Sequence, residues 1–180
     1  MATKLEQLKE WAKQNVTMID LLPNNSNLQV TTRLIDVLED EVDEKYYLSE
    51  EKTKKLTLDS SLTSQDKHGI AVREATKQGY AIAEQGDSVN VTYPDSKTRR
   101  GRVGKQVAQT LQAGEVNQGV VMEDIRIRKL TPLECWRLQG FSDEQFYKAK
   151  DSGVSNSQLY KQAGNSVTVN VVDAIVKELD

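Results

Sequence analysis

A glycine-interrupted run of basic residues, KTRRGRVGK at residues 97–105, is the segment best suited to bind an anion. Arginine presents a planar pair of N–H donors that can hold a phosphate in a bidentate manner, and glycine lets a backbone approach it closely. Glutamine and asparagine side chains follow at residues 106–118, and these amides can pair with purine edges in the major groove of DNA. The sequence alone leaves two interpretations open: a nucleic-acid contact surface or a solvated run of charge.

A second candidate for ligand binding is the tetrapeptide Gly164-Asn165-Ser166-Val167. We expect it to open the last helix, where free backbone amides, two capping side chains and the helix dipole would suit a carboxylate or hydroxyl of a small ligand. Ordinary junctions between a loop and a helix have the same composition, so the spacing by itself favours a structural role.

The remaining reactive side chains do not form a self-sufficient active site. Cys135 is the only thiol and is expected inside a helix, where it would be a small buried residue. His68, the only histidine, is expected in a solvated loop. With one cysteine and one histidine in the sequence, no zinc cluster is expected. No glycine-rich nucleotide-binding motif is present. We therefore expect no catalytic residue and no metal site in this chain.

The elements that would position these residues differ along the chain. Amphipathic helices are predicted for residues 1–14 and 34–42, separated by a turn-rich linker at residues 21–29. Residues 57–122 suggest a loop-rich β region, with short strands at YAIA (80–83), VNVTY (89–93) and GVVM (119–122). From Ile127 onward the pattern predicts helices, which begin at the capping signals Thr131-Pro132-Leu133-Glu134, Ser142 and Ser155.

The overall composition hides a local charge contrast. The 180 residues carry a net charge of −3, which does not favour nucleic acid. Residues 97–129, however, hold eight basic and three acidic residues, a net charge of +5, whereas residues 36–44 hold six acidic residues and no base. No apolar run is long enough to span a membrane and the N-terminus lacks the core of a signal peptide, so we expect a cytoplasmic protein.

Two segments together resemble a known family. RKLTPLECWRLQGF (128–141) is similar to the ninth conserved motif of the DNA cytosine-5 methyltransferases, and YKQAGNSVTVNVV (160–172) is similar to the tenth. The order and the separation of about twenty residues agree with the family. Residues 98–121 resemble the target-recognition domain of its phage-like members, including the dipeptide Thr110-Leu111.

The resemblance implies a fold, a cofactor and site residues. The fold would be α+β: an irregular β-rich target-recognition domain, and C-terminal helices that would complete a Rossmann-like catalytic domain supplied by another chain. Residues 1–29 would be an N-terminal helix and linker, 30–56 a helical connector, 57–125 the recognition domain and 126–180 the two motifs. S-adenosylmethionine would be bordered by Asn165, Ser166 and Val167. Contacts to double-stranded DNA would come from Arg99, Arg100, Arg102, Lys105, Thr110, Leu111 and Gln118.

Three functions remain open at this point. Because the Pro-Cys, Glu-Asn-Val and Gln-x-Arg-x-Arg motifs of the family are absent from the sequence, we expect a chain that is inactive alone and completes a methyltransferase with an N-terminal catalytic half. That enzyme would flip a cytosine out of the duplex and methylate its C5 atom. The alternatives are a non-catalytic DNA-binding relic and a protein-interaction domain based on the acidic segment.

We also expect that alanine at Arg99, Arg100 and Arg102 lowers DNA affinity and leaves the fold intact.

Overall fold

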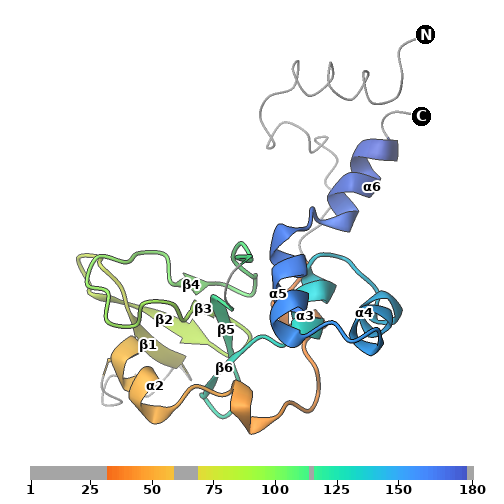
Figure 1. Ribbon diagram of the computed structural model, residues 1–180. Coiled ribbons are helices and arrows are strands. Elements are labelled where there is room, and N and C mark those ends of the chain that lie inside the picture. The colour runs from red at the N-terminus through yellow and green to blue at the C-terminus, as the bar shows by residue number, and fades with distance from the viewer. Residues whose placement is uncertain (1–31, 59–68, 114–115, 178–180) are drawn as a thin grey trace. The chain divides into compact units, whose positions relative to one another are not determined.

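The computed structural model describes residues 32–58, 69–113 and 116–177, which fall into two units. Residues 32–169 form one unit, and the described part of the other is the segment 170–177. The helix predicted for residues 1–14, the linker at 21–29 and His68 lie outside the described residues. Helices and small antiparallel sheets together make the fold α+β, as expected (Figure 1).

The β-rich part of the larger unit contains two antiparallel sheets. β1 (Gly69–Arg73) pairs with β2 (Tyr80–Glu84), and a four-stranded sheet has the order β4-β3-β5-β6. The members of the second sheet are β3 (Ser88–Asn90), β4 (Val103–Gly104), β5 (Gln118–Val121) and β6 (Ile127–Lys129). Both sheets contribute to one apolar cluster, which consists of Val72, Ala83, Val89, Val121 and Ile127.

Three of the strands coincide with the predicted ones, and two helical predictions are wrong. Ile127–Lys129 is a strand, because Ile127 pairs with Val121 across the β5–β6 hairpin. Residues 34–42 contain only a 3₁₀ turn, η1 (Leu34–Val37), after which the backbone at Leu38 is extended. A second 3₁₀ turn, η2 (Glu44–Tyr46), follows. The acidic segment is therefore not a helix, which removes the element on which the protein-interaction hypothesis depended.

A short helix that was not predicted, α2 (Glu50–Leu56), lies beside the β1–β2 pair (Figure 1). The Ser49 hydroxyl caps it by accepting from the amide of Lys52, and its first turn is acidic while its last turn is basic. Leu56 is buried, and the next residue, Thr57, bridges to Val72 of β1. The helix thus continues directly into the sheet region.

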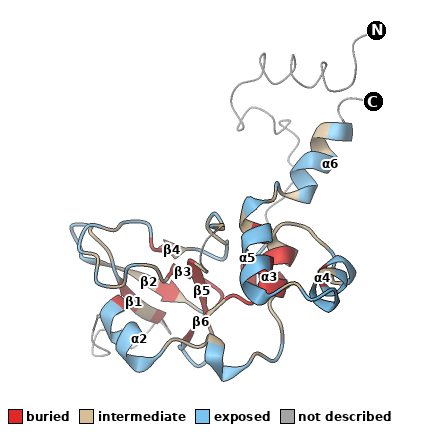
Figure 2. Cartoon of the chain, in the orientation of Figure 1, coloured by how far each residue is buried: buried red, intermediate tan, exposed pale blue. Residues whose placement is uncertain are grey.

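The predicted capping signals do begin the helices α3 (Pro132–Leu138), α4 (Asp143–Asp151) and α5 (Asn156–Asn165). Thr131 and Glu134 form a reciprocal capping box at α3, and Ser142 and Gln145 form another at α4. Figure 2 shows that α3 is the most deeply buried of the three helices. The core between them is aromatic, and the Trp136 ring lies 5.1 Å from that of Phe141 and 5.6 Å from that of Phe146. Trp136 also donates its indole N–H to the carbonyl of Leu159, which ties α3 to α5.

A buried ion pair joins the β sheet to α3. Arg128 of β6 donates from both terminal nitrogens to the Glu134 carboxylate, at 2.9 and 2.7 Å, and both side chains are fully buried. Glu134 additionally accepts from the amides of Thr131 and Glu39. One carboxylate therefore connects β6, the start of α3 and the segment after η1.

Strain at the β5–β6 turn gives a stability prediction. Ile125 has a φ of 64° at the residue before Arg126, and a β-branched side chain is poorly suited to this left-handed conformation. We expect Ile125→Gly to raise the free energy of unfolding by about 1 kcal/mol, because glycine adopts this conformation without steric cost. Urea unfolding would measure the change. The control is Ile35→Gly, at an exposed isoleucine without a positive φ, which should not gain stability. A loss of stability in Ile125→Gly would contradict the proposal that Ile125 is strained.

No helix in the described ranges is long and apolar enough to cross a membrane. Within the same ranges, no group of three or more His, Cys, Asp or Glu side chains is arranged to hold a metal ion.

Candidate nucleic-acid interface and cofactor segment

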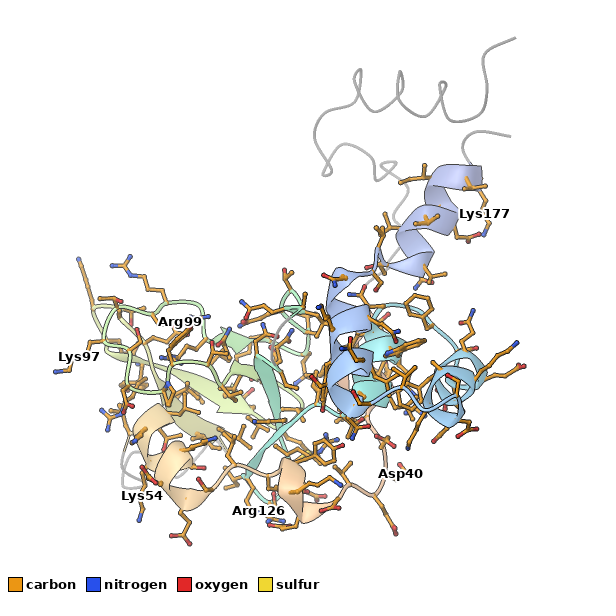
Figure 3. All side chains as sticks on the ribbon, in the orientation of Figure 1. Asp40, Lys54, Lys97, Arg99, Arg126 and Lys177 are labelled. Carbon is orange, nitrogen blue, oxygen red and sulfur yellow. The ribbon has the colours of Figure 1, made fainter. Side chains whose placement is uncertain are left out.

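The basic segment 97–105 divides into surface residues and structural residues. Lys97 and Arg100 are exposed and Arg99 is half-buried, and Lys97 projects away from the strands (Figure 3). Among the described residues, none of these three forms a salt bridge. The backbone beneath them is fixed, because the Arg99 carbonyl accepts from the amide of Ala75 at 2.7 Å. Three cations are thus available to an anionic ligand on an anchored loop.

Arg102, in contrast, is only 1% exposed and works inside the fold. Its guanidinium donates to the carbonyls of Asn90, Thr92 and Tyr93 at 3.2, 3.1 and 2.8 Å. Burial, followed by the nearby charge of Arg99, lowers the pKa of this guanidinium. Alanine at Arg102 would remove the guanidinium that donates to these three carbonyls, of which that of Tyr93 would keep the amide of Ser96. We therefore expect the triple alanine variant to destabilise the fold, contrary to the expectation from the sequence.

Lys105 is also occupied by a contact within the protein. Its ammonium lies 2.7 Å from the carboxylate of Asp87, which is completely buried, and 3.6 Å from that of Glu84. Asp87 further accepts from the side chain and backbone of Gln106 and from the amide of Glu84. Lys105 therefore neutralises a buried carboxylate, although more than half of its side chain stays exposed.

The amide side chains after the basic segment mostly bind the backbone. Gln118 is buried, donates to the Gln109 carbonyl and accepts from the Gln109 amide at 2.6 Å. Asn117 donates to the carbonyl of Thr110 at 3.0 Å and accepts from the amide of Gln112. These two residues of β5 and its approach hold the loop of residues 109–112. Gln118 is therefore not at the surface where the sequence suggested a DNA contact.

Thr110 and Leu111, in the same loop, differ in burial. Thr110 is exposed, whereas Leu111 is half-buried and packs against the core cluster of α3 and α5. The loop also meets α5 at Gly164, where an added Cβ would come within 2.5 Å of the carbonyl of Gln112 and 2.6 Å of the Cα of Ala113. The absence of a side chain at Gly164 therefore permits direct backbone contact between the loop and the helix.

The segment Gly164–Val167 ends a helix instead of opening one. Asn165 is the last residue of α5, and the Ser166 hydroxyl donates to the carbonyl of Ala163 at 2.8 Å. The next helix, α6 (Val169–Lys177), begins only at Val169. The helix-start argument for ligand binding is therefore wrong, because the dipole at this point carries the negative sign.

Gln139, which sequence reasoning missed, organises this segment. Its side chain donates to the carbonyl of Ala163 at 3.0 Å and accepts from the Thr168 hydroxyl at 2.9 Å. Its backbone carbonyl accepts from the amide of Val169 at 2.8 Å. Asn165 and Val167 remain exposed, with 66% of Val167 accessible. Gln139 thus connects the end of α3 to the residues that the family resemblance assigns to the cofactor.

Cys135 lies buried in α3, as expected from the sequence. Burial raises the pKa of its thiol far above the ordinary value, and the charge of Glu134 adds to the effect. A thiol in this environment stays protonated at neutral pH and is a poor nucleophile.

Helix α6 carries an apolar face of its own. Val169, Val172 and Val176 recur at helical spacing, and each is at least 36% exposed. Such a face ordinarily packs against another apolar surface.

Sequence comparisons identify a matching protein family and several similar proteins. The family model of the C-5 cytosine-specific DNA methylases matches residues 3–180. The orphan methyltransferase M.SPBetaI of Bacillus phage SPbeta is 38% identical over 83% of this chain and 42% of its own length. The orphan methyltransferase M.SPRI of Bacillus phage SPR is 32% identical over 98% of this chain and 56% of its own length. The type II methyltransferase M.BanI of Aneurinibacillus aneurinilyticus is 31% identical over 75% of this chain. The chain spans about half or less of these relatives' length.

Proposed function

Because the chain belongs to the family of C-5 cytosine-specific DNA methylases, we propose that it is the DNA-recognition and cofactor-completing part of a DNA cytosine-5 methyltransferase. It would act with an N-terminal catalytic half that supplies the Rossmann-like sheet, the nucleophilic cysteine and the assisting glutamate. The observation that supports this proposal is one connected arrangement. Gln139 of the ninth motif hydrogen-bonds to the tenth, and the loop of residues 109–112, which we assign to DNA recognition, contacts α5 at Gly164. One unit of this chain thereby links surfaces that would face DNA and cofactor.

The catalytic half would also explain the apolar face of α6. Val172 and Val176 are 45% and 44% exposed, so covering each would contribute about half of the roughly 1.5–3 kcal/mol that fully burying a valine gives. The proposed occupant of this face is the sheet of the catalytic domain. Cys135 takes no part in the chemistry, since its thiol is buried and protonated.

S-adenosylmethionine would supply the methyl group in the complete enzyme. The residues of the 165–167 segment fit such a molecule: the exposed amide of Asn165 can hydrogen-bond, and the exposed Val167 offers an apolar surface. The Ser166 hydroxyl is committed to the carbonyl of Ala163, so its role would be to fix the segment. Gln139 would orient the same residues without touching the cofactor.

Reconstitution tests the split enzyme. This chain, co-refolded with the N-terminal half of a phage relative, is expected to transfer a labelled methyl group to DNA, while each half alone is inactive. Cys135→Ala should retain the transfer, whereas alanine at the Pro-Cys cysteine of the other half should abolish it. A folded mixture of both halves that transfers no methyl group would favour the non-catalytic DNA-binding fragment.

The basic loop gives a prediction about DNA affinity. Glutamine at Lys97, Arg99 and Arg100 together is expected to weaken duplex binding by about 100-fold or more at low salt, because each phosphate contact adds about 0.9 to the salt slope. Anisotropy titrations at several salt concentrations would measure both the affinity and the slope.

A variant with the same charge change is the control for that experiment. Glutamine at Lys148, Lys150 and Lys161, which lie on α4 and α5, also removes three positive charges. It should leave the slope nearly unchanged. Equal losses in the two variants would mean that net charge alone governs binding, and the assignment of the loop would be wrong.

A further inference from the structure

The turn that precedes the basic loop presents an aromatic ring in an unfavourable backbone conformation. Tyr93 is 72% exposed and has a φ of 49°, a conformation that bulky residues rarely adopt. An exposed tyrosine at this position adds no core packing to offset the strain. Strain that persists in a folded protein is over-determined by its surroundings and tends to occur at functional sites.

Buried contacts hold this turn in place. The Tyr93 carbonyl accepts from Arg102 Nη2 at 2.8 Å and from the amide of Ser96 at 3.0 Å. Arg102 itself is fixed from below, since its backbone amide donates to the Glu74 carboxylate at 2.6 Å. The buried arginine of the basic loop therefore acts as the support for an exposed ring.

The surroundings of Tyr93 suit a nucleic-acid strand. The guanidinium of Arg99 lies 5.6 Å from the centre of the tyrosine ring. The turn also forms one wall of a cleft of about 680 Å³, which Lys52 and Lys129 line as well. Neither lysine forms a salt bridge with a described residue, whereas the cleft's carboxylate, Asp95, lies 3.8 Å from Lys55.

From this arrangement we propose that Tyr93 is a stacking residue for DNA, which packs its ring against an unstacked base while the neighbouring cations contact phosphates. The inference rests on the proposed function and specifies how that surface binds. Stacking of a base on an aromatic ring accepts any base and does not release counterions. It therefore adds to DNA affinity without changing the salt slope, unlike a phosphate contact of lysine or arginine. We expect the Tyr93 ring to contact DNA where a base is unstacked, and not in a fully paired duplex.

The test compares Tyr93→Asn with Tyr93→Phe in the full chain. Asparagine tolerates the left-handed conformation but cannot stack, so it should keep or raise the melting temperature, by about 2–4 °C if the strain costs 1 kcal/mol. The probe is a fluorescein-labelled duplex that is either fully paired or carries one unpaired base. Wild type should prefer the duplex with the unpaired base, and Tyr93→Asn should bind that duplex about 10-fold more weakly with an unchanged salt slope.

Two controls define the alternatives. Tyr93→Phe keeps the ring and should bind like wild type, and Tyr147→Ala removes an exposed ring from α4 and should have no effect on binding. Wild-type affinity in Tyr93→Asn, or an equal loss in Tyr93→Phe, would overturn the stacking role while the proposed function stands. Absence of salt-dependent DNA binding by wild type would refute both.

Discussion

Glu134→Gln is expected to lower the free energy of unfolding by about 3–5 kcal/mol, because it leaves the fully buried Arg128 without its counter-charge. Part of this loss of stability comes from weaker hydrogen bonds, since the backbone amides of Glu39 and Thr131 donate to the Glu134 carboxylate. The two amides donate to different oxygens of Glu134, so glutamine would keep one neutral acceptor and place an NH2 donor against the other amide. Urea unfolding followed by circular dichroism would measure the change.

A double variant separates the ion pair from its surroundings. Arg128→Met combined with Glu134→Leu removes both charges. The double variant should lose less stability than the sum of the losses of Arg128→Met alone and Glu134→Leu alone. The exposed pair Arg33–Asp36 is the matched control, since Asp36→Asn should change stability little. Additive losses at Arg128 and Glu134 would show that the pair does not couple β6 to α3.

Gly164→Ala is expected to cost about 1–3 kcal/mol and to displace the loop of residues 109–112, since the new Cβ would overlap the backbone of Gln112 and Ala113. Backbone atoms cannot move aside as the end of a flexible side chain can. The loop of residues 109–112 is held from its other side by Asn117 and Gln118, so it cannot retreat without breaking their hydrogen bonds. We therefore expect DNA affinity to fall together with stability.

Unfolding curves and DNA titrations of the same Gly164→Ala preparation would test both parts. Gln162→Ala, an exposed change two residues earlier on α5, is the control and should alter neither quantity. An unchanged stability and affinity in Gly164→Ala would contradict a close contact between the loop and the helix.

The parts of the fold that the sequence predicted depend on neighbouring residues. The capping boxes at Thr131 and Ser142 and the cap at Ser155 are formed by side chains three residues from their partners. The helix α2 carried a comparable signal that was overlooked. Ser49 precedes an acidic first turn, and Glu51 pairs with Lys55 one turn later.

The parts that were missed depend on distant residues. Leu34 and Val37 have helical spacing, but the amide of Leu34 donates to the carbonyl of Gln106, more than seventy residues away. Ile127 lies in a strand that also contacts a distant segment, because its carbonyl accepts from the amide of Leu48 at 3.0 Å. Propensity within a short window cannot specify such pairings, and tertiary contacts override it.

The same limit applies to the candidate site. Arginine, glutamine and asparagine bind carbonyl groups as readily as they bind phosphates and bases. Arg102 and Gln118 satisfy backbone groups, whereas Arg99 and Arg100 stay at the surface. The residue type alone does not distinguish these two uses, whereas the burial of each side chain does.

The buried position of Cys135 makes it a built-in reporter of local opening. The chain has one cysteine, and a thiol reagent can reach it only when α3 separates from the helices packed around it. The labelling rate in excess reagent would therefore follow the population of molecules with an open α3. Added DNA, or the catalytic half, should slow the labelling in proportion to its binding, which would reveal partners of this chain without any engineered probe.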